Sequence, residues 1–413
     1  MMWRLNPRLS KAGWTRSGRG GWSRPLRAPY RSPRSAPIIG SYQPPRLRQL
    51  WTLRSIFLMA QPPRLRKAGI KTRTQTALFY TLLFSSLLLL SCNKPAASTE
   101  EVTEIHIPRG AGGVGFLPLL VMEKYSLIER QAKEAGISNI RVKWIDLGGP
   151  AVMNDALLSG AADFIAAGPP AFIILWDRTR DSAKVMGVAA MSSLPMYLNA
   201  RADHLKKLDD VTEKDKIAVT AVKVSIPSII MQMYARNKYG AAQFSRFDKY
   251  TVTMSHPDAV LALLSGSGAI DAHFTSPPFH QRERKDPRVH TIMTSDEVMG
   301  GSTTFTMLST TTAFREKNPR VYASVLKALD EAIDVIVNDR EDAADILLAS
   351  TAEGGFSRDE VIALMKDPSV KFTTAPENVL KYAEFMHDAG SIQKRPASWK
   401  DLFFPEIQDS PGS

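Results

Sequence analysis

Short apolar, β-rich runs alternate with segments of helical periodicity from Glu104 onward. This alternation is typical of an α/β sheet whose strands are joined by crossover helices. The pattern predicts strands over 104–108, 139–146, 162–166, 184–190, 216–221, 249–254, 270–274 and 303–308. It predicts helices near 116–135, 150–159, 169–178, 226–239 and 257–265, followed by a helical stretch over 318–349, 357–366 and 376–389.

Proline and glycine mark the ends of two of these helices. Pro150 opens one predicted helix and Gly160 follows its end, while Ser225 precedes another that stops before Gly240. Proline tolerates the first helical turn, where its missing N–H has no partner in any case, and glycine ends helices readily. These boundaries are therefore the sharpest in the prediction.

An internal repeat organises the body of the chain. Ala156-Leu157-Leu158-Ser159-Gly160 leads through Asp163 to Gly168-Pro169-Pro170, and Ala262-Leu263-Leu264-Ser265-Gly266 leads through Asp271 to Ser276-Pro277-Pro278. In both copies the first Pro follows the Asp by six positions. Chance similarity of two Ala-Leu-rich helices is the alternative. We interpret the repeat as two lobes of like topology, each with a loop at the carboxyl end of a strand, where open α/β sheets bind ligands.

The N-terminal part is different in character. Residues 77–90 form the one long apolar run, preceded by Arg64, Arg66, Lys67, Lys71 and Arg73, as in a signal peptide. Leu89-Leu90-Ser91-Cys92 resembles the lipobox of bacterial lipoproteins, which implies acylation of Cys92 as the first mature residue; an accidental or buried Cys is the alternative. We expect a signal peptide over 59–91 and a tether over 92–103.

Residues 1–58 are rich in Arg, Pro, Gly and Ser and have no hydrophobic periodicity, so we expect them to be disordered. They resemble a transit peptide in composition, but a start codon placed too far upstream, with Met59 as the true start, is the simpler explanation.

The charge distribution excludes nucleic acid as the main ligand. The net charge of +12 arises from residues 1–91, which hold 17 basic residues and no acidic one; the remainder carries 36 basic and 41 acidic residues. No basic surplus remains there to neutralise phosphates. With one Cys in the chain, a disulfide scaffold and a multi-cysteine metal site are excluded as well.

The order of these features resembles one family. The lipobox, the glycine-rich loop 110–115 after the first strand, Leu119-Leu120-Val121 and the paired Ala-Leu-Leu-Ser-Gly…Asp segments are similar to the solute-binding proteins of nitrate, sulfonate and taurine importers. The resemblance covers roughly 104–400. It implies an α/β fold of the two-lobed type II periplasmic binding class, with mixed sheets flanked by helices and two hinge crossings.

The same resemblance implies a division of the body. Lobe 1 would comprise 104–195 and 303–413, with lobe 2 inserted as 196–302 and crossings near 192–200 and 300–306. It further implies a monomeric protein, held by lipid in the periplasm or at the outer face of the cytoplasmic membrane, that delivers a solute to an ABC permease and its ATPase. We expect no cofactor and no metal.

The glycine loop is the first candidate site. Gly110 to Gly115 satisfies G-x-G-x-x-G after a strand, but no acid stands at a strand end about 20 residues on, as a dinucleotide site requires. We therefore expect Gly112, Gly113 and Val114 to bring backbone N–H groups close to a small anion. Arg109 beside the loop would pair with that anion or form a surface salt bridge.

Other candidates lie at strand ends and at a crossing. Ser225 either caps its helix or faces solute in the cleft, and Lys223 either adds positive charge to the cleft or is exposed. Small and hydroxyl residues at the equivalent loops of the repeat would allow close approach to solute; these are Gly168, Pro169, Thr275 and Ser276. Ser192 and Ser193 precede the first crossing, and their hydroxyls either face the cleft or only end a strand.

No catalytic residues are predicted. The seven His residues show no metal-ligand spacing, and neither a nucleophile elbow nor a Walker loop occurs. The leading hypothesis is therefore capture of a small anionic solute, nitrate-, sulfonate- or taurine-like or a carboxylate. The alternative is an enzyme on the same fold, of the pyrimidine-precursor synthase or sulfinate-cleaving type; the absence of Cys after position 92 argues against its thiol-dependent forms.

Overall fold

The computed structural model describes residues 100–110, 112–350 and 355–413, all within one compact unit. The predicted N-terminal extension, signal peptide and Cys92 lie outside the described residues, as does most of the predicted tether. Among the described residues, no helix combines the length and the apolar character needed to cross a bilayer.

The strands of lobe 1 lie side by side in one continuous sequence of neighbours. Strands β1 (Glu104–Pro108) and β2 (Arg141–Ile145) pair in parallel, and β10 (Thr304–Thr311) lies antiparallel between β3 (Ile165–Ala167) and β4 (Val185–Ser193). The backbone N–H of Asp163 donates to the carbonyl of His106 over 3.0 Å and joins the two groups. The resulting order is β2-β1-β3-β10-β4.

Lobe 2 repeats this order with its own strands. Its sheet runs β7-β6-β8-β5-β9, and β5 lies antiparallel between β8 and β9 just as β10 lies between β3 and β4. The bounds are β5 Tyr197–Ala200, β6 Ile217–Val219, β7 Thr251–Thr253, β8 Ala272–Thr275 and β9 His290–Thr294. The prediction of two lobes of like topology is confirmed.

The repeated sequence segments occupy equivalent places in the two lobes. Helices α4 (Pro150–Ser159) and α7 (His256–Ser265) both end at a left-handed glycine, Gly160 with φ +75° and Gly266 with φ +64°. A strand of the respective sheet follows each helix, β3 in lobe 1 and β8 in lobe 2. The equivalence arises because a glycine adopts this conformation without the steric cost that a side chain would add.

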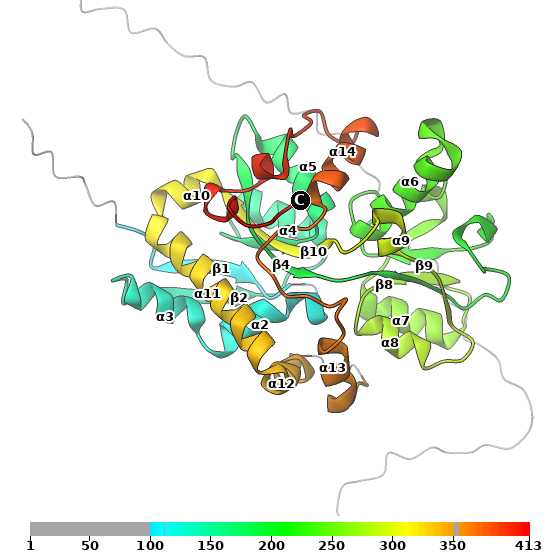
Figure 1. The fold of residues 1–413 in the computed structure, drawn as a ribbon, viewed down its shortest axis with the longest axis horizontal. Coiled ribbons are helices and arrows are strands. Elements are labelled where there is room, and N and C mark those ends of the chain that lie inside the picture. Colours follow the sequence, from blue (N-terminus) through cyan, green and yellow to red (C-terminus); the bar gives the residue numbers. More distant parts are fainter. Residues whose placement is uncertain (1–99, 111, 351–354) are drawn as a thin grey trace, which may run out of the picture. The chain divides into compact units, whose positions relative to one another are not determined.

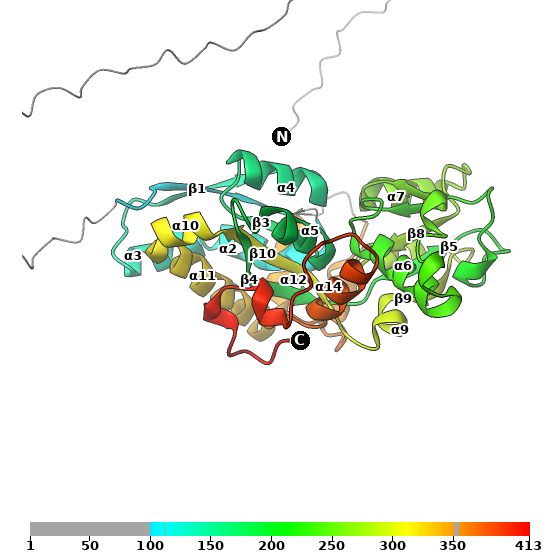
Figure 2. The ribbon, with the colours of Figure 1, turned by 90° about the horizontal axis from the view of Figure 1, so that it is seen from above.

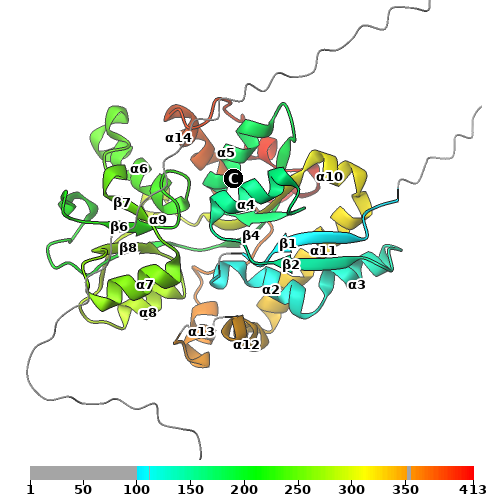
Figure 3. The ribbon, with the colours of Figure 1, turned by 180° about the vertical axis from the view of Figure 1, so that it is seen from behind.

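Each antiparallel strand immediately follows a passage between the lobes. The chain leaves lobe 1 between β4 and β5 and returns to it between α9 (Ser295–Met299) and β10. Figure 3 shows α6 (Ile226–Tyr239), α7 and α8 (Phe279–Arg284) around the sheet of lobe 2, with α7 and α8 side by side.

Helices cover the sheet of lobe 1. Helix α11 (Pro319–Asn338) packs on α2 (Leu117–Lys124) and α3 (Leu127–Glu134), as Figure 1 shows, and α14 (Val379–Asp388) packs against α5 (Pro169–Thr179), as Figure 2 shows. Val321, Val325 and Leu329 recur every four residues on α11 and are fully buried. Each such side chain contributes about 1.5–3 kcal/mol by leaving water.

Short elements complete the described part. They are α10 (Thr312–Lys317), α12 (Arg340–Ser350), α13 (Arg358–Met365), and the 3₁₀ turns η1 (Val114–Phe116), η2 (Leu208–Asp210), η3 (Ala241–Gln243), η4 (Asp248–Tyr250), η5 (Trp399–Leu402) and η6 (Pro405–Ile407).

The predicted elements are largely in place, with identifiable errors. The helix predicted near 116–135 is two helices, because Ser126 adopts φ +48° between α2 and α3. The stretch 318–349 breaks at Asp339, which leaves the helical region at ψ 77°. Strands β5 and β9 and helices α9 and α10 were not predicted, since each is short and lacks a clear period; α8 is the helix expected after the Pro277-Pro278 turn of the repeat.

Candidate functional site

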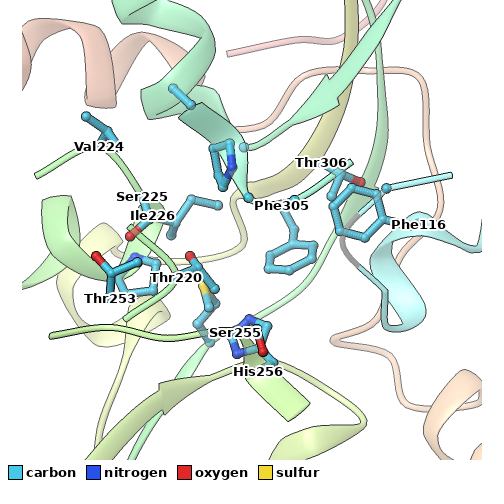
Figure 4. A pocket seen from close by; sticks show the side chains of 18 of the residues that line it. Phe116, Thr220, Val224, Ser225, Ile226, Thr253, Ser255, His256, Phe305 and Thr306 are labelled. Carbon is cyan, nitrogen blue, oxygen red and sulfur yellow. The ribbon is translucent and has the colours of Figure 1, made fainter. Parts of the chain in front are cut away.

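A cavity of about 400 Å³ lies between residues of the two lobes. This is within the range of small-molecule sites. Figure 4 shows side chains of lobe 2, among them Thr220, Ser225 and Thr253, on one side, and Phe116, Phe305 and Thr306 of lobe 1 on the other. The lining comprises Gly110, Phe116, Leu147, Gly148, Gly149, Pro150, Gly168, Ala171, Met196, Thr220, Val224, Ser225, Ile226, Pro227, Thr253, Ser255, His256, Pro257, Phe305 and Thr306.

Four helices begin at this cavity, two from each lobe. Their N-cap residues are Gly149 for α4, Gly168 for α5, Ser225 for α6 and Ser255 for α7, and all four line it. Each helix follows a strand of its sheet, so the carboxyl ends of β2, β3, β6 and β7 deliver them to one place. Helix N-termini carry unpaired N–H groups and partial positive charge, and they attract anions.

Proline opens the first turn of each of these helices. Pro150, Pro169, Pro227 and Pro257 occupy the first or second helical position. Proline removes a donor that has no intrahelical partner and sets φ for the helix. In α7 the hydroxyl of Ser255 accepts from the N–H of Asp258, whereas the first turns of α4, α5 and α6 have no side-chain cap and can donate their N–H groups to a ligand.

The lining is mainly apolar. Phe116 and Phe305 pack edge to face with their ring centroids 6.3 Å apart, and Leu147, Met196 and Ile226 extend the apolar surface. Hydroxyl groups of Thr220, Ser225, Thr253, Ser255 and Thr306 supply the polar surface. Among the described residues, no Lys, Arg, Asp or Glu lines the cavity, so attraction of an anion here depends on backbone N–H groups and neutral side-chain donors.

Of the described residues that line the cavity, His256 alone has a titratable side chain. Burial and the neighbouring His273 hold the pKa of His256 well below its ordinary value, so the imidazole is neutral at pH 7. Its Nδ1 lies 2.9 Å from Nε2 of His273. The cavity therefore contains a neutral imidazole and no cationic side chain.

The glycine loop lies beside the cavity, and two of its glycines are required sterically. Gly110 has φ +91°, and a Cβ there would lie 2.1 Å from Cδ1 of Phe116. A Cβ on Gly115 would lie 2.2 Å from Cδ1 of Phe305. These glycines let the two phenyl rings reach the cavity wall.

Two predicted site residues line the cavity, Gly168 and Ser225. Ser225 does not cap α6 with its side chain; its hydroxyl donates to the carbonyl of Ala221 over 2.6 Å. The first-turn N–H groups of α6 are thus not covered by this hydroxyl.

Both predicted cations lie elsewhere. Arg109 pairs with Glu123 at 2.7 Å and with Asp146 at 3.0 Å, and the hydrogen bond with Glu123 raises its pKa. Lys223, with φ +67°, lines a separate surface hollow beside Asp248. The salt-bridge alternative for Arg109 is the arrangement that the structure shows.

The remaining predicted residues surround the cavity without lining it. Ser192 donates to the carbonyl of Gly115 over 2.9 Å, and Ser193 donates to Glu377 over 2.5 Å. Thr275 and Ser276 are buried at the end of β8. Gly112, Gly113, Val114 and Pro169 are likewise absent from the lining.

Most of the cavity-lining residues of lobe 2 were not predicted from the sequence. Ser255, His256 and Pro257 stand after β7 where Gly149 and Pro150 stand after β2. The repeat contained this signal, because Ala156-Leu157-Leu158 and Ala262-Leu263-Leu264 place α4 and α7 in register. In the described part of the chain, no group of three or more His, Cys, Asp or Glu is placed to hold a metal ion.

No family model matches the sequence, and no curated protein matches it either. Solved structures do. The alkanesulfonate-binding protein of Xanthomonas axonopodis pv. citri, bound to MOPS, is 14% identical over 74% of this chain and 99% of its own, with a TM-score of 0.57.

Two further structures are similar to a comparable share of the chain. The periplasmic nitrate-binding protein of Synechocystis PCC 6803 is 13% identical over 73% of this chain and 84% of its own, with a TM-score of 0.51. A Candida albicans protein with the generic periplasmic binding protein fold is 10% identical over 73% and 94%, with a TM-score of 0.54. The chain therefore has the periplasmic binding protein fold, and the predicted fold class is confirmed.

Proposed function

We propose that this protein is the extracytoplasmic solute-binding component of an ABC importer and captures a small organic anion between its two lobes. The observation that carries the proposal is the convergence of four helix N-termini, two from each lobe, on one cavity. An anion there would be attracted by both lobes at once, so its binding favours the form in which they approach.

The lining narrows the class of anion. Phenyl and aliphatic groups line much of the cavity, and a nitrate ion would leave them without a partner. A sulfonate or carboxylate with a short apolar body fits both parts of the lining. The similar alkanesulfonate-binding protein, with a bound sulfonate buffer, supports this choice.

Delivery and anchoring complete the proposal. The solute-bound form would dock on a permease driven by a separate ATPase. Cys92, if acylated, would hold the protein at the outer face of the cytoplasmic membrane or in the periplasm through the 92–103 tether. We propose lobe boundaries of 104–195 with 303–413 for lobe 1 and 196–302 for lobe 2, and a monomer in solution.

The enzyme alternative gains no support from the comparisons, since the sulfonate- and nitrate-binding structures above are binding proteins. Its chemistry would also require a reactive side chain at the cavity. Of the described lining residues, His256 alone has a titratable side chain, and the acid that its hydrogen bonds reach through His273 lies behind the wall. A binding role accounts for this arrangement without a chemical step.

Calorimetry on the purified protein tests the proposal. The panel comprises butane-1-sulfonate, benzenesulfonate, taurine, nitrate and small carboxylates, with butylamine and butanol as cationic and neutral counterparts of the first. We expect an organic anion to bind best. A best ligand that is cationic or neutral overturns the anion preference, and no binding across the panel overturns the proposed function.

A further inference from the structure

A chain of hydrogen bonds leads from the cavity wall into the interior of lobe 2. Nδ1 of His256 lies 2.9 Å from Nε2 of His273, and Nδ1 of His273 lies 2.5 Å from Oε1 of Glu283. The side chains of His273 and Glu283 are fully buried. A carboxyl group thus lies two imidazoles behind the cavity, in a place where an unneeded ionisable group would be costly.

The inner end of the chain is fixed. The amide nitrogen of Asn199 donates to Oε2 of Glu283 over 2.8 Å, and Oδ1 of Asn199 accepts from the hydroxyl of Thr291 over 2.8 Å. Oε2 is therefore an acceptor. A proton on Glu283 must lie on Oε1, which faces His273.

That single proton decides the direction of every hydrogen bond in the chain. With Glu283 protonated, Oε1 donates to Nδ1 of His273, so His273 carries its proton on Nε2 and donates to Nδ1 of His256. His256 then carries its own proton on Nε2, which has no partner among the described residues. With Glu283 ionised, each bond reverses and Nε2 of His256 becomes an acceptor.

The surroundings favour the protonated form at neutral pH. Burial raises the pKa of Glu283 to about 8, and burial lowers the pKa of His273 to about 3. The charged groups on the packed elements bind elsewhere, since Arg201 pairs with Asp286, Arg284 donates to the carbonyl of Val289 and Asp258 accepts from Ser255. His280, which is also titratable, contacts Asn199 and stacks on Tyr197.

His256 is also held in orientation at the wall. Its ring stacks on Phe279 with centroids 5.3 Å apart, and it occupies the first turn of α7, whose N-cap Ser255 lines the same cavity. At this helix end the N–H of Asp258 already donates to the hydroxyl of Ser255, and Pro257 has no N–H. The Nε2 of His256 is therefore the side-chain donor that this helix end presents to a bound anion when Glu283 is protonated.

We propose that His256 is a specificity-determining residue, donating from Nε2 to the anionic head group of the solute, and that Glu283 is a positioning residue that imposes this direction through His273. This inference rests on the proposed function and names the side chain that recognises the anion in the cavity. The Nε2–H donor of His256 explains how a cavity whose described lining has no cationic side chain can select an anion, which accepts hydrogen bonds. Loss of the proton turns the same group into an acceptor that repels the anion.

The test measures affinity against pH with probes whose own charge does not change. Butane-1-sulfonate, benzenesulfonate and nitrate stay ionised from pH 6 to pH 9.5, and the tightest binder is titrated by calorimetry across this range. If only the protonated chain binds, affinity falls about tenfold per pH unit above the pKa of Glu283. We therefore expect a loss of about 30-fold between pH 6 and pH 9.5 for the wild type.

Glu283→Gln is the decisive variant. Its amide donates to Nδ1 of His273 at every pH while its oxygen still accepts from Asn199, so it mimics the protonated acid. We expect its affinity to vary less than threefold over the range. His256→Phe keeps the stacking on Phe279 but has no donor; we expect it to bind at least tenfold more weakly than the wild type at pH 6, without the pH dependence.

The outcomes separate the two proposals. Wild-type affinity that does not change with pH, or a Glu283→Gln variant that follows the wild-type profile, overturns the hydrogen-bond chain while leaving anion binding in place. Should Glu283→Gln fail to fold, a His256→Phe variant as tight as the wild type at pH 6 overturns it. A wild type that binds no anion of the full calorimetric panel at pH 6, taurine and small carboxylates included, overturns the proposed function and this inference together.

Discussion

Gly168 of lobe 1 and Ile226 of lobe 2 meet at the cavity, and a Cβ atom on Gly168 would lie 2.9 Å from Cδ1 of Ile226. Both residues stand at helix N-termini, at α5 and α6 respectively. The absence of a side chain at Gly168 therefore allows these two helix ends, which belong to different lobes, to lie close together.

Gly168→Ala should weaken solute binding by separating these helix ends. Gly168 has φ −74° and ψ 155°, which any residue adopts, so the effect would come from the added methyl group and not from backbone strain. The Cδ1 atom of Ile226 is the end of a flexible side chain and can turn aside, but the carbonyl oxygen of Phe305, which would lie 3.3 Å from the same Cβ, is backbone. The cost should therefore lie near the lower end of the ~1–3 kcal/mol typical of overpacking. We expect roughly a fivefold loss of affinity in calorimetry.

Gly149→Ala is the matched control. Gly149 is the N-cap of α4 with φ −69°, and its Cβ would lie 3.6 Å from the carbonyl oxygen of Thr220, an ordinary contact. We expect its affinity to stay within about twofold of the wild type. Equal losses in the two variants would show that the Gly168–Ile226 approach has no special role.

The stability of the protein should fall as the pH rises above 6.5. Glu283 titrates near 4.5 in an unfolded chain and near 8 when buried, so between these values the folded state holds more protons than the unfolded state. Its contribution to stability is complete below pH 4.5 and is lost as the pH rises through 8. The slope is at most about 1.4 kcal/mol per pH unit.

Below pH 6.5 the buried imidazoles act in the opposite sense. Burial lowers the pKa of His273 to about 3 and of His280 to about 4, so the unfolded state holds more protons there and stability rises with pH. Urea unfolding from pH 5 to pH 8.5 should therefore show a maximum near pH 6.5. Glu283→Gln should flatten the decline above it, and an unchanged decline in this variant would assign that decline to other groups.

Glu101 should stabilise the start of α11. Its carboxylate is 8% exposed and accepts from the backbone N–H groups of Arg320 at 3.0 Å and Val321 at 2.9 Å. Glu101→Ala leaves both donors unsatisfied, and we expect a loss of about 1–3 kcal/mol in the free energy of unfolding. Urea denaturation measures it, with the exposed Glu100→Ala as control; equal stability of the two variants would contradict this role.

Cys92 should carry the lipid anchor. Cys92→Ala protein should remain uncleaved at this position and lose the lipid mass. Each buried CH₂ contributes about 0.8 kcal/mol to membrane attachment, so the variant should also leave the membrane fraction. Intact mass spectrometry of the wild type decides the matter: an unlipidated mature N-terminus elsewhere would contradict lipidation and leave the two-lobed fold unaffected.

Local sequence determined most helices and their ends. Pro150 and Gly160 bound α4, and the N-cap Ser225 and the C-cap Gly240 flank α6, where the sequence placed them. These boundaries depend on the backbone preferences of single residues and on hydrogen bonds within one turn, which neighbours in sequence decide. The repeat also predicted tertiary structure, because two similar sequence segments that fold alike indicate two lobes with the same strand order.

Pairing across the chain decided what local pattern could not. Strand β5 has four residues, and its place between β8 and β9 comes from partners that lie about 75 and 95 positions later. A strand this short becomes stable through its two neighbours and not through its own preference for extended structure. Tyr197 to Ala200 are too few residues for a hydrophobic period to predict this strand.

The site shows the same division. Glycine and serine at strand ends marked Gly168 and Ser225, because helix ends at the carboxyl edge of a sheet follow from local order. The direction of a side chain does not: Arg109 turns to Glu123 and Asp146 and leaves the cavity without a cation. The approach of Gly168 to Ile226, and the link from His256 through His273 to the carboxyl of Glu283, arose only when the tertiary structure brought distant segments into contact. Packing and burial depend on neighbours that the local sequence does not contain.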